Sequence, residues 1–182
     1  MPRQITDHGT PDRFVTGTVG MPGERTFYLQ SRSGADIVSV VLEKQQVSLL
    51  SEKMAEMLDE IGRSDPTVAA AEPGAEDLDP LAMPITEAFR VGAFGMGWDT
   101  GTHRVVLEIH AVDDEHEDVP DIGDDDSEGP DCLRVWLPPA EARAFIRRST
   151  AVVSAGRPPC PFCHLPLDPE GHICPRANGY RR

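Results

Sequence analysis

The chain has 182 residues, of which 39% are hydrophobic, and a formal net charge of −14 at pH 7. This length fits one domain with its own core plus a small module. No apolar run approaches the roughly 20 residues of a membrane span, and none follows the first residues as in a signal peptide, so we expect a cytoplasmic protein. Residues 113–131 hold eleven acids and no Lys or Arg, which leaves only −3 for the rest of the chain. This acidity disfavours nucleic acid as a partner.

The first part of the chain, residues 1–62, predicts three strands and a helix. Three runs rich in β-branched and aromatic residues begin near Phe14, Arg25 and Ile37, and Gly-containing turns separate them. From Ser48 to Ile61 the apolar spacing changes to three and four residues, which is typical of an amphipathic helix. The predicted buried face of this helix contains Leu49, Leu50, Lys53, Met54, Met57, Leu58 and Ile61.

Residues 85–156 predict the same order of elements. Strand-like runs begin near Phe89, Arg104 and Leu133, and a helical pattern covers 140–155. Pro138-Pro139 suits the first helical turn, because its missing N–H would have no partner there, and Gly156 suits the position after the last turn.

The two parts of the chain look like an internal duplication. Phe14-Val-Thr-Gly17-Thr-Val-Gly20-Met21 recurs as Phe89-Arg-Val-Gly92-Ala-Phe-Gly95-Met96, with four identities at one constant offset. We therefore predict an α+β fold of tandem duplicated βββα units with antiparallel pairing. The units would share a sheet or stack as a sandwich.

Two segments look too polar to join a core. Residues 63–84 contain four Pro, three consecutive Ala and several acids, so we expect a flexible linker. The acidic segment 113–131 joins two predicted strands and is expected to be a disordered hairpin loop.

The last segment, residues 157–182, carries the clearest motif. Cys160-Pro-Phe-Cys163 places two thiols three residues apart, and His172-Ile-Cys174 follows after a turn at 168–171. A Cys3His set is a common ligand set of structural Zn²⁺. We therefore predict a zinc knuckle with Cys160, Cys163, His172 and Cys174 as ligands.

Other interpretations of these residues remain open. Cys-x-x-Cys is also a redox motif, although it then needs a βαβ context that this Pro-rich tail does not offer. His164 is a rival ligand to His172, and it occupies a turn position where φ > 0 is expected. Cys132 stands alone near a predicted strand start and is interpreted as a small buried hydrophobe.

No constellation of residues names a reaction. The Gly-rich runs at 17–23 and 92–97 lack the Lys-Ser/Thr of a phosphate loop and open no helix, so we interpret them as turns and close strand packing. Glu43–Gln46 suits a solvated helix start, although these polar groups could also contact a ligand. His103 and His110 alternate with apolar residues, without a nucleophile beside them in the sequence.

Runs 12–30, 41–46 and 89–92, together with the tail 160–182, resemble a family of uncharacterised actinobacterial proteins classed as a domain of unknown function. The resemblance covers nearly the whole chain outside 63–83 and the acidic segment. It implies an actinobacterial cytoplasmic protein. Genes of that family tend to lie near those of a histidine-phosphatase-like protein, a lipid-kinase-like protein and a mycothiol-pathway ligase. The family supplies no catalytic residues.

The sequence therefore favours a zinc-binding, non-enzymatic protein that binds a protein partner as an adaptor. One alternative is an enzyme that acts with those neighbours on a phosphorylated or thiol metabolite. Another is nucleic-acid binding through the zinc tail and Arg176, Arg181 and Arg182.

Overall fold

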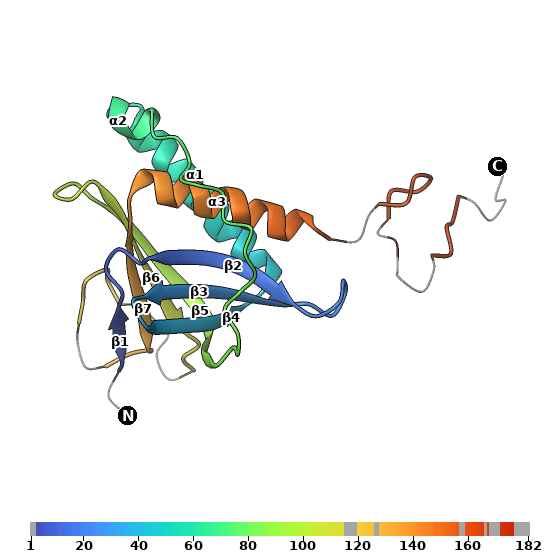
Figure 1. The fold of residues 1–182 in the computed structure, drawn as a ribbon, viewed down its shortest axis with the longest axis horizontal. Coiled ribbons are helices and arrows are strands. Elements are labelled where there is room, and N and C mark those ends of the chain that lie inside the picture. The colour runs from blue at the N-terminus through green and yellow to red at the C-terminus, as the bar shows by residue number, and fades with distance from the viewer. Residues whose placement is uncertain are drawn as a thin grey trace.

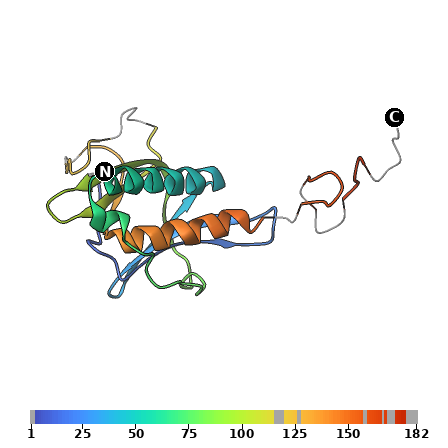
Figure 2. The same ribbon diagram turned by 90° about the horizontal axis from the view of Figure 1, so that it is seen from above.

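The computed structural model describes residues 3–114, 120–125, 128–156, 159–165, 167 and 172–176. In chain order the elements are β1 (Ile5–Asp7), β2 (Arg13–Val19), β3 (Thr26–Ser33), β4 (Asp36–Leu42), α1 (Lys44–Gly62), α2 (Pro66–Ala69), β5 (Glu87–Asp99), β6 (Arg104–Ala111), β7 (Cys132–Leu137) and α3 (Pro139–Ser154). The strands form one sheet, and α1 and α3 lie side by side over one face of it (Figure 1, Figure 2).

The sheet contains two antiparallel meanders joined by one parallel pair. Its strand order is β1-β7-β6-β5-β4-β3-β2, with β2, β3 and β4 forming one meander and β5, β6 and β7 the other. Strands β4 and β5 are parallel, with Val40 opposite Phe89. The α+β prediction is confirmed, and the two βββα runs share one sheet. Strand β1, which pairs in parallel with β7, was not predicted.

Both long helices start where the sequence predicts. Helix α1 begins after Glu43, whose backbone N–H donates to Oε1 of Gln46 at 2.7 Å, as in a capping box. Helix α3 begins at Pro139, which occupies its first turn, where a residue without an N–H loses no hydrogen bond. None of the helices in the described residues combines the length and apolar content that crossing a membrane requires.

The main core lies between the helices and the sheet. Leu50, Met54 and Leu58 of α1 and Phe145 of α3 are buried there, and the rings of Phe145 and Phe14 are 4.7 Å apart. The prediction for Leu49 was wrong, because this side chain is 52% exposed. The buried stripe is centred on Val47, Leu50, Met54 and Leu58, which places Leu49 outside it.

Residues 63–84 differ from the expected flexible linker, because they are anchored along their length. Val68 of α2 and Leu81 are both buried. Asp77 accepts hydrogen bonds from Arg13, at 2.5 Å from Nε and 2.9 Å from Nη2, and from Nη1 of Arg148 at 3.0 Å. In Figure 1 the segment descends from α2 past α3 and the sheet. It thereby brings Leu81 to the face opposite the helices, in a second small core with Val15, Tyr28 and Val41.

The acidic segment also differs from the disordered loop that was expected, in the residues that the structure describes. Gly123 N–H donates to Oε1 of Glu108 at 3.0 Å, and Asp125 accepts from Arg134 at 2.6 Å. Arg3 donates to the carbonyl oxygens of Asp124 and Pro130, both at 2.9 Å. Residues 115–119 and 126–127 lie outside the described residues. The described part therefore covers the second meander on the face opposite the helices.

Replacing Asp77 by asparagine tests whether residues 74–81 are held by charge. The Arg13 guanidinium beside Asp77 holds the pKa of this carboxyl below its usual value of about 3.9. Because the folded-state pKa is the lower one, Asp77 stabilises the fold above about pH 4, and this contribution is lost as pH falls through the folded pKa. We expect Asp77→Asn to lower the free energy of unfolding by about 1.5–3 kcal/mol at neutral pH.

The measurement is urea unfolding of both proteins at about pH 7 and about pH 3, and the difference between them should shrink at the lower pH. Glu76→Gln is the matched control, since the Glu76 carboxylate has no hydrogen-bond or ion-pair partner among the described residues. A difference that stayed constant with pH would show that the charge of Asp77 does not hold the segment.

Candidate metal centre

The C-terminal motif forms a tight turn that presents two thiols to one side. The backbone N–H of His164 donates to the carbonyl of Cys160 at 2.9 Å, and that of Cys160 donates to Leu165 at 2.8 Å. His164 has φ of 60°, the left-handed conformation that the sequence predicted for this position. These two bonds close the loop around Cys160 and Cys163.

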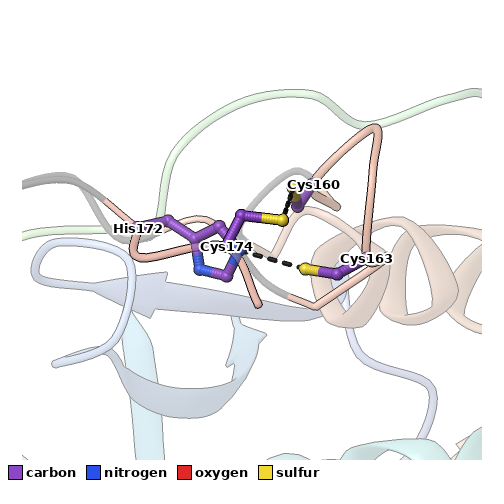
Figure 3. Close-up of side chains that lie close together, drawn as sticks. All are labelled: Cys160, Cys163, His172 and Cys174. Atoms are coloured by element: carbon purple, nitrogen blue, oxygen red, sulfur yellow. Dashed lines mark hydrogen bonds between the residues drawn. The ribbon is translucent and has the colours of Figure 1, made fainter. Parts of the chain in front are cut away.

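Four potential ligands meet at this turn, as Figure 3 shows. The ligand atoms of Cys160, Cys163, His172 and Cys174 all lie within 4.8 Å of one another. Sγ of Cys160 is 3.8 Å from Sγ of Cys174, and Sγ of Cys163 is 3.0 Å from Nε2 of His172. The cysteines are free thiols, not a disulfide. The cluster could hold a metal ion, and it contains the four residues that the sequence named.

The surroundings favour ionisation of one thiol. The pKa of Cys160 is lowered to about 6, first because of the backbone N–H of Cys163 and also because of that of Phe162. Burial raises the pKa of Cys163, and the neighbouring thiols raise it further. Cys160 and Cys174 are buried, at 2% and 6% exposure. A thiolate is the form of cysteine that binds metal, so the turn prepares Cys160 for this role.

His164, the rival to His172, is not part of the cluster. Its backbone forms the turn, whereas His172 contributes Nε2 beside Cys163. The turn predicted at residues 168–171 lies outside the described residues. The geometry is thus compatible with the predicted ligand set, and the identity of a metal stays a prediction.

Three apolar side chains of the segment that carries the cluster face solvent. Phe162, Leu165 and Ile173 are all exposed, and they belong to the same short segment as the ligands. Arg176 donates from Nη1 to the carbonyl of Phe162 at 3.1 Å. In Figures 1 and 2 the segment lies beyond the end of α3, away from the sheet. Two of the four ligands are thus buried, whereas apolar side chains of the same segment are exposed.

The other candidate residues have structural roles. Glu43 and Gln46 cap α1, and Gln46 Nε2 also donates to the carbonyl of Val91 at 3.1 Å. The run 92–97 lies inside β5, where a Cβ on Gly92 would come within 2.9 Å of the Ala111 carbonyl oxygen. This supports the interpretation of close strand packing. His103 lies between β5 and β6 with its ring near that of Trp98.

A cavity of about 460 Å³ lies between β2, α3 and residues 75–78. Its size is within the range of about 300–1,000 Å³ that ligand pockets have. However, Arg13 and Arg148, which line it, are paired with Asp77. These two guanidinium groups of the cavity wall therefore hold residues 74–81 in place.

A second cluster of potential ligands, not predicted from the sequence, lies on the seven-stranded sheet. Cys132 is buried, as predicted, but its neighbours are Glu108 and His110, and the three ligand atoms lie within 4.8 Å of one another. Burial raises the pKa of Cys132 to about 11 and lowers the pKa of His110, so at neutral pH both side chains are uncharged. The available signal was the alternation Glu108-Ile-His110 in an otherwise apolar strand, which puts both polar groups on one face.

Comparison with known proteins identifies a family. A family model described as "Protein of unknown function (DUF3090)" matches residues 7–174, a span that includes both clusters. No curated protein and no solved structure matches the chain.

Proposed function

The chain belongs to the DUF3090 family. We propose that it is a protein-binding module, and that a structural Zn²⁺ folds its C-terminal segment, residues 157–182, which contacts the partner. The observation that carries the proposal is the convergence of Cys160, Cys163, His172 and Cys174 within 4.8 Å. Three thiolates and one imidazole fill all four positions of a tetrahedral zinc ion. A closed site leaves no position for a substrate, which favours a structural over a catalytic metal.

Zinc would supply the folding energy that this segment lacks. The segment contains no helix or strand of its own in the described residues, and its apolar side chains are exposed. Small metal-bound segments commonly fold only with their ion. Zinc would therefore hold Phe162, Leu165 and Ile173 in fixed positions on the outside. The three free thiols need a reducing compartment, so the proposal places the chain in the cytoplasm.

We also infer that the body arose from two βββα units. The meanders follow each other across the sheet with the same strand directions, since β4 and β5 are parallel and all other pairs within the meanders are antiparallel. The repeated Phe-x-x-Gly run lies in the first strand of each unit, β2 and β5. Such a body is a scaffold that carries the tail at the end of its last helix.

The first test is zinc stoichiometry of the tail. Elemental analysis of purified protein should show that Cys174→Ser and Cys160→Ser each lose about one zinc equivalent per chain relative to the parent. His164→Asn is the matched control, because this imidazole lies next to Cys163 but outside the cluster, and it should retain the metal. Loss of zinc in His164→Asn with retention in His172→Asn would assign the fourth ligand to His164.

The second test concerns the partner. The tagged chain is purified from its native host beside Ile173→Ser, with Leu49→Ser as a control that changes an exposed leucine on the body. We expect a protein that co-purifies with the parent and the control but not with Ile173→Ser or Cys174→Ser. Nuclease treatment should leave the complex intact. If nuclease released the partner, or if single-stranded RNA bound at roughly 0.15 M salt and dissociated steeply as salt rose, the tail would be a nucleic-acid binder instead.

A further inference from the structure

The face of the second meander that points away from the helices carries a buried row of chemical groups. Cys132 of β7 lies directly opposite His110 of β6, and Glu108 lies two residues along β6 on the same face. Glu108 and His110 are 0% exposed and Cys132 is 1% exposed. These three residues, termed here the sheet cluster, are thus withdrawn from solvent in the part of the chain that the structure describes.

The sheet cluster contains polar atoms without partners. Both ring nitrogens of His110 and Oε2 of Glu108 are buried and form no hydrogen bond with any described residue. Nε2 of His110 and Oε2 of Glu108 face each other at 3.4 Å, without the geometry of a hydrogen bond. Buried polar atoms are nearly always satisfied, because leaving them unpaired forfeits their hydration. Two unpaired polar groups that face each other indicate that an ion or ligand binds between them.

Glu108 is held so that one oxygen is available. Its Oε1 accepts from Nε of Arg134 at 2.7 Å and from the backbone N–H of Gly123 at 3.0 Å. These bonds fix the carboxylate and leave Oε2 turned toward His110. Hydrogen bonds to the outer atoms of ligands orient them in the same manner in protein metal sites.

We propose that Glu108, His110 and Cys132 form a second metal site for a divalent transition ion of the zinc class. Carboxylate oxygen, imidazole nitrogen and thiolate sulfur are ligands that Zn²⁺ accepts together, and their atoms lie within 4.8 Å of one another. On binding, Cys132 releases its proton to solvent. The thiolate and the carboxylate then balance the two charges of the ion. Two guanidinium groups lie nearby. That of Arg134 is offset by Asp125 at 2.6 Å and Asp7 at 3.7 Å, and that of Arg3 donates to the carbonyl oxygens of Asp124 and Pro130.

The neighbouring strand leaves room beside this site for a side chain of the acidic segment. Gly95 of β5 lies opposite Glu108, and a Cβ there would come 3.6 Å from Nε2 of His110 and 3.3 Å from Cγ1 of Ile122. The distance to His110 would be an ordinary contact, whereas that to Ile122 would be tight, so the absence of this carbon lets Ile122 of the acidic segment lie close against the site. The sheet cluster offers three ligands, whereas the tail offers four. Its ion therefore keeps one position for water or a small ligand, as catalytic zinc sites do.

The test uses the full chain with Cys160→Ser, Cys163→Ser and Cys174→Ser, which leaves Cys132 as its sole thiol. The metal-free triple variant is titrated with Co²⁺, whose absorption reports thiolate ligation. We expect about one equivalent to bind and to produce a thiolate-to-cobalt charge-transfer band. Since the tail thiols are gone, the result is independent of the zinc proposed for the tail.

Added substitutions identify the ligands. His110→Asn and Glu108→Gln in the triple variant should each weaken cobalt binding by at least about tenfold. Ile109→Val is the matched control, since it lies between them on β6 with its side chain in the main core, and it should leave binding unchanged. Circular dichroism checks that each variant is folded. If the triple variant does not fold, the decisive measurement is zinc content of the parent against Cys132→Ser, where we expect the loss of about one equivalent.

Cobalt that does not bind, binds without the charge-transfer band, or binds equally well to His110→Asn would overturn the proposal. So would equal zinc content of the parent and Cys132→Ser. Zinc loss in Cys174→Ser bears on the tail alone, so failure of either site is recognisable without the other.

Discussion

Replacing Arg134 by methionine is expected to lower the free energy of unfolding by about 3–5 kcal/mol, because it leaves the buried carboxylate of Glu108 without its charged partner. Arg134 is itself buried, and it donates to Glu108 from Nε at 2.7 Å. Methionine preserves much of the side-chain volume, so the loss reports mainly the charge. The measurement is urea unfolding in the presence of a chelator, so that no metal ion offsets the charge of Glu108.

A double-mutant cycle combines Arg134→Met with Glu108→Gln. If the unpaired charge causes the loss, Arg134→Met with Glu108→Gln should be more stable than Arg134→Met alone. Asp125→Asn is the control, since it removes the exposed partner of the same arginine and should cost no more than about 1 kcal/mol. Equal stability of the single and double variants would show that Arg134 acts by packing.

Leu58→Ala is expected to lower the free energy of unfolding by about 2–5 kcal/mol, since this side chain is fully buried between α1 and the sheet. Leu49 lies on the same helix and was predicted to share the same face, but it is exposed. Leu49→Ala should therefore change stability by no more than about 0.5 kcal/mol. Thermal and urea unfolding of the two variants measure the difference, and comparable losses would show that α1 is rotated relative to the fold described here.

The sequence alone located the long strands and helices and the four residues of the tail cluster. Strand and helix periods, Pro139 at a helix start and the Cys160–Cys163 spacing are local patterns, and local geometry decides what they form. The four residues of the tail cluster all lie between positions 160 and 174, so a local spacing pattern was sufficient to relate them. The exposed position of Leu49 was not predictable in this way, since two overlapping stripes on α1 satisfied the same spacing.

Only the tertiary structure decided the roles of the polar segments and of the sheet cluster. Composition predicted flexible chain at 63–84, yet Asp77 meets Arg13 and Arg148, which lie 64 and 71 residues away in sequence. Likewise Cys132 seemed a lone hydrophobe until strand pairing placed it opposite His110. In both cases the partners come from distant parts of the chain, and their meeting depends on strand order and register. Neither is encoded in a local pattern, because register is fixed by packing of the whole sheet against its helices.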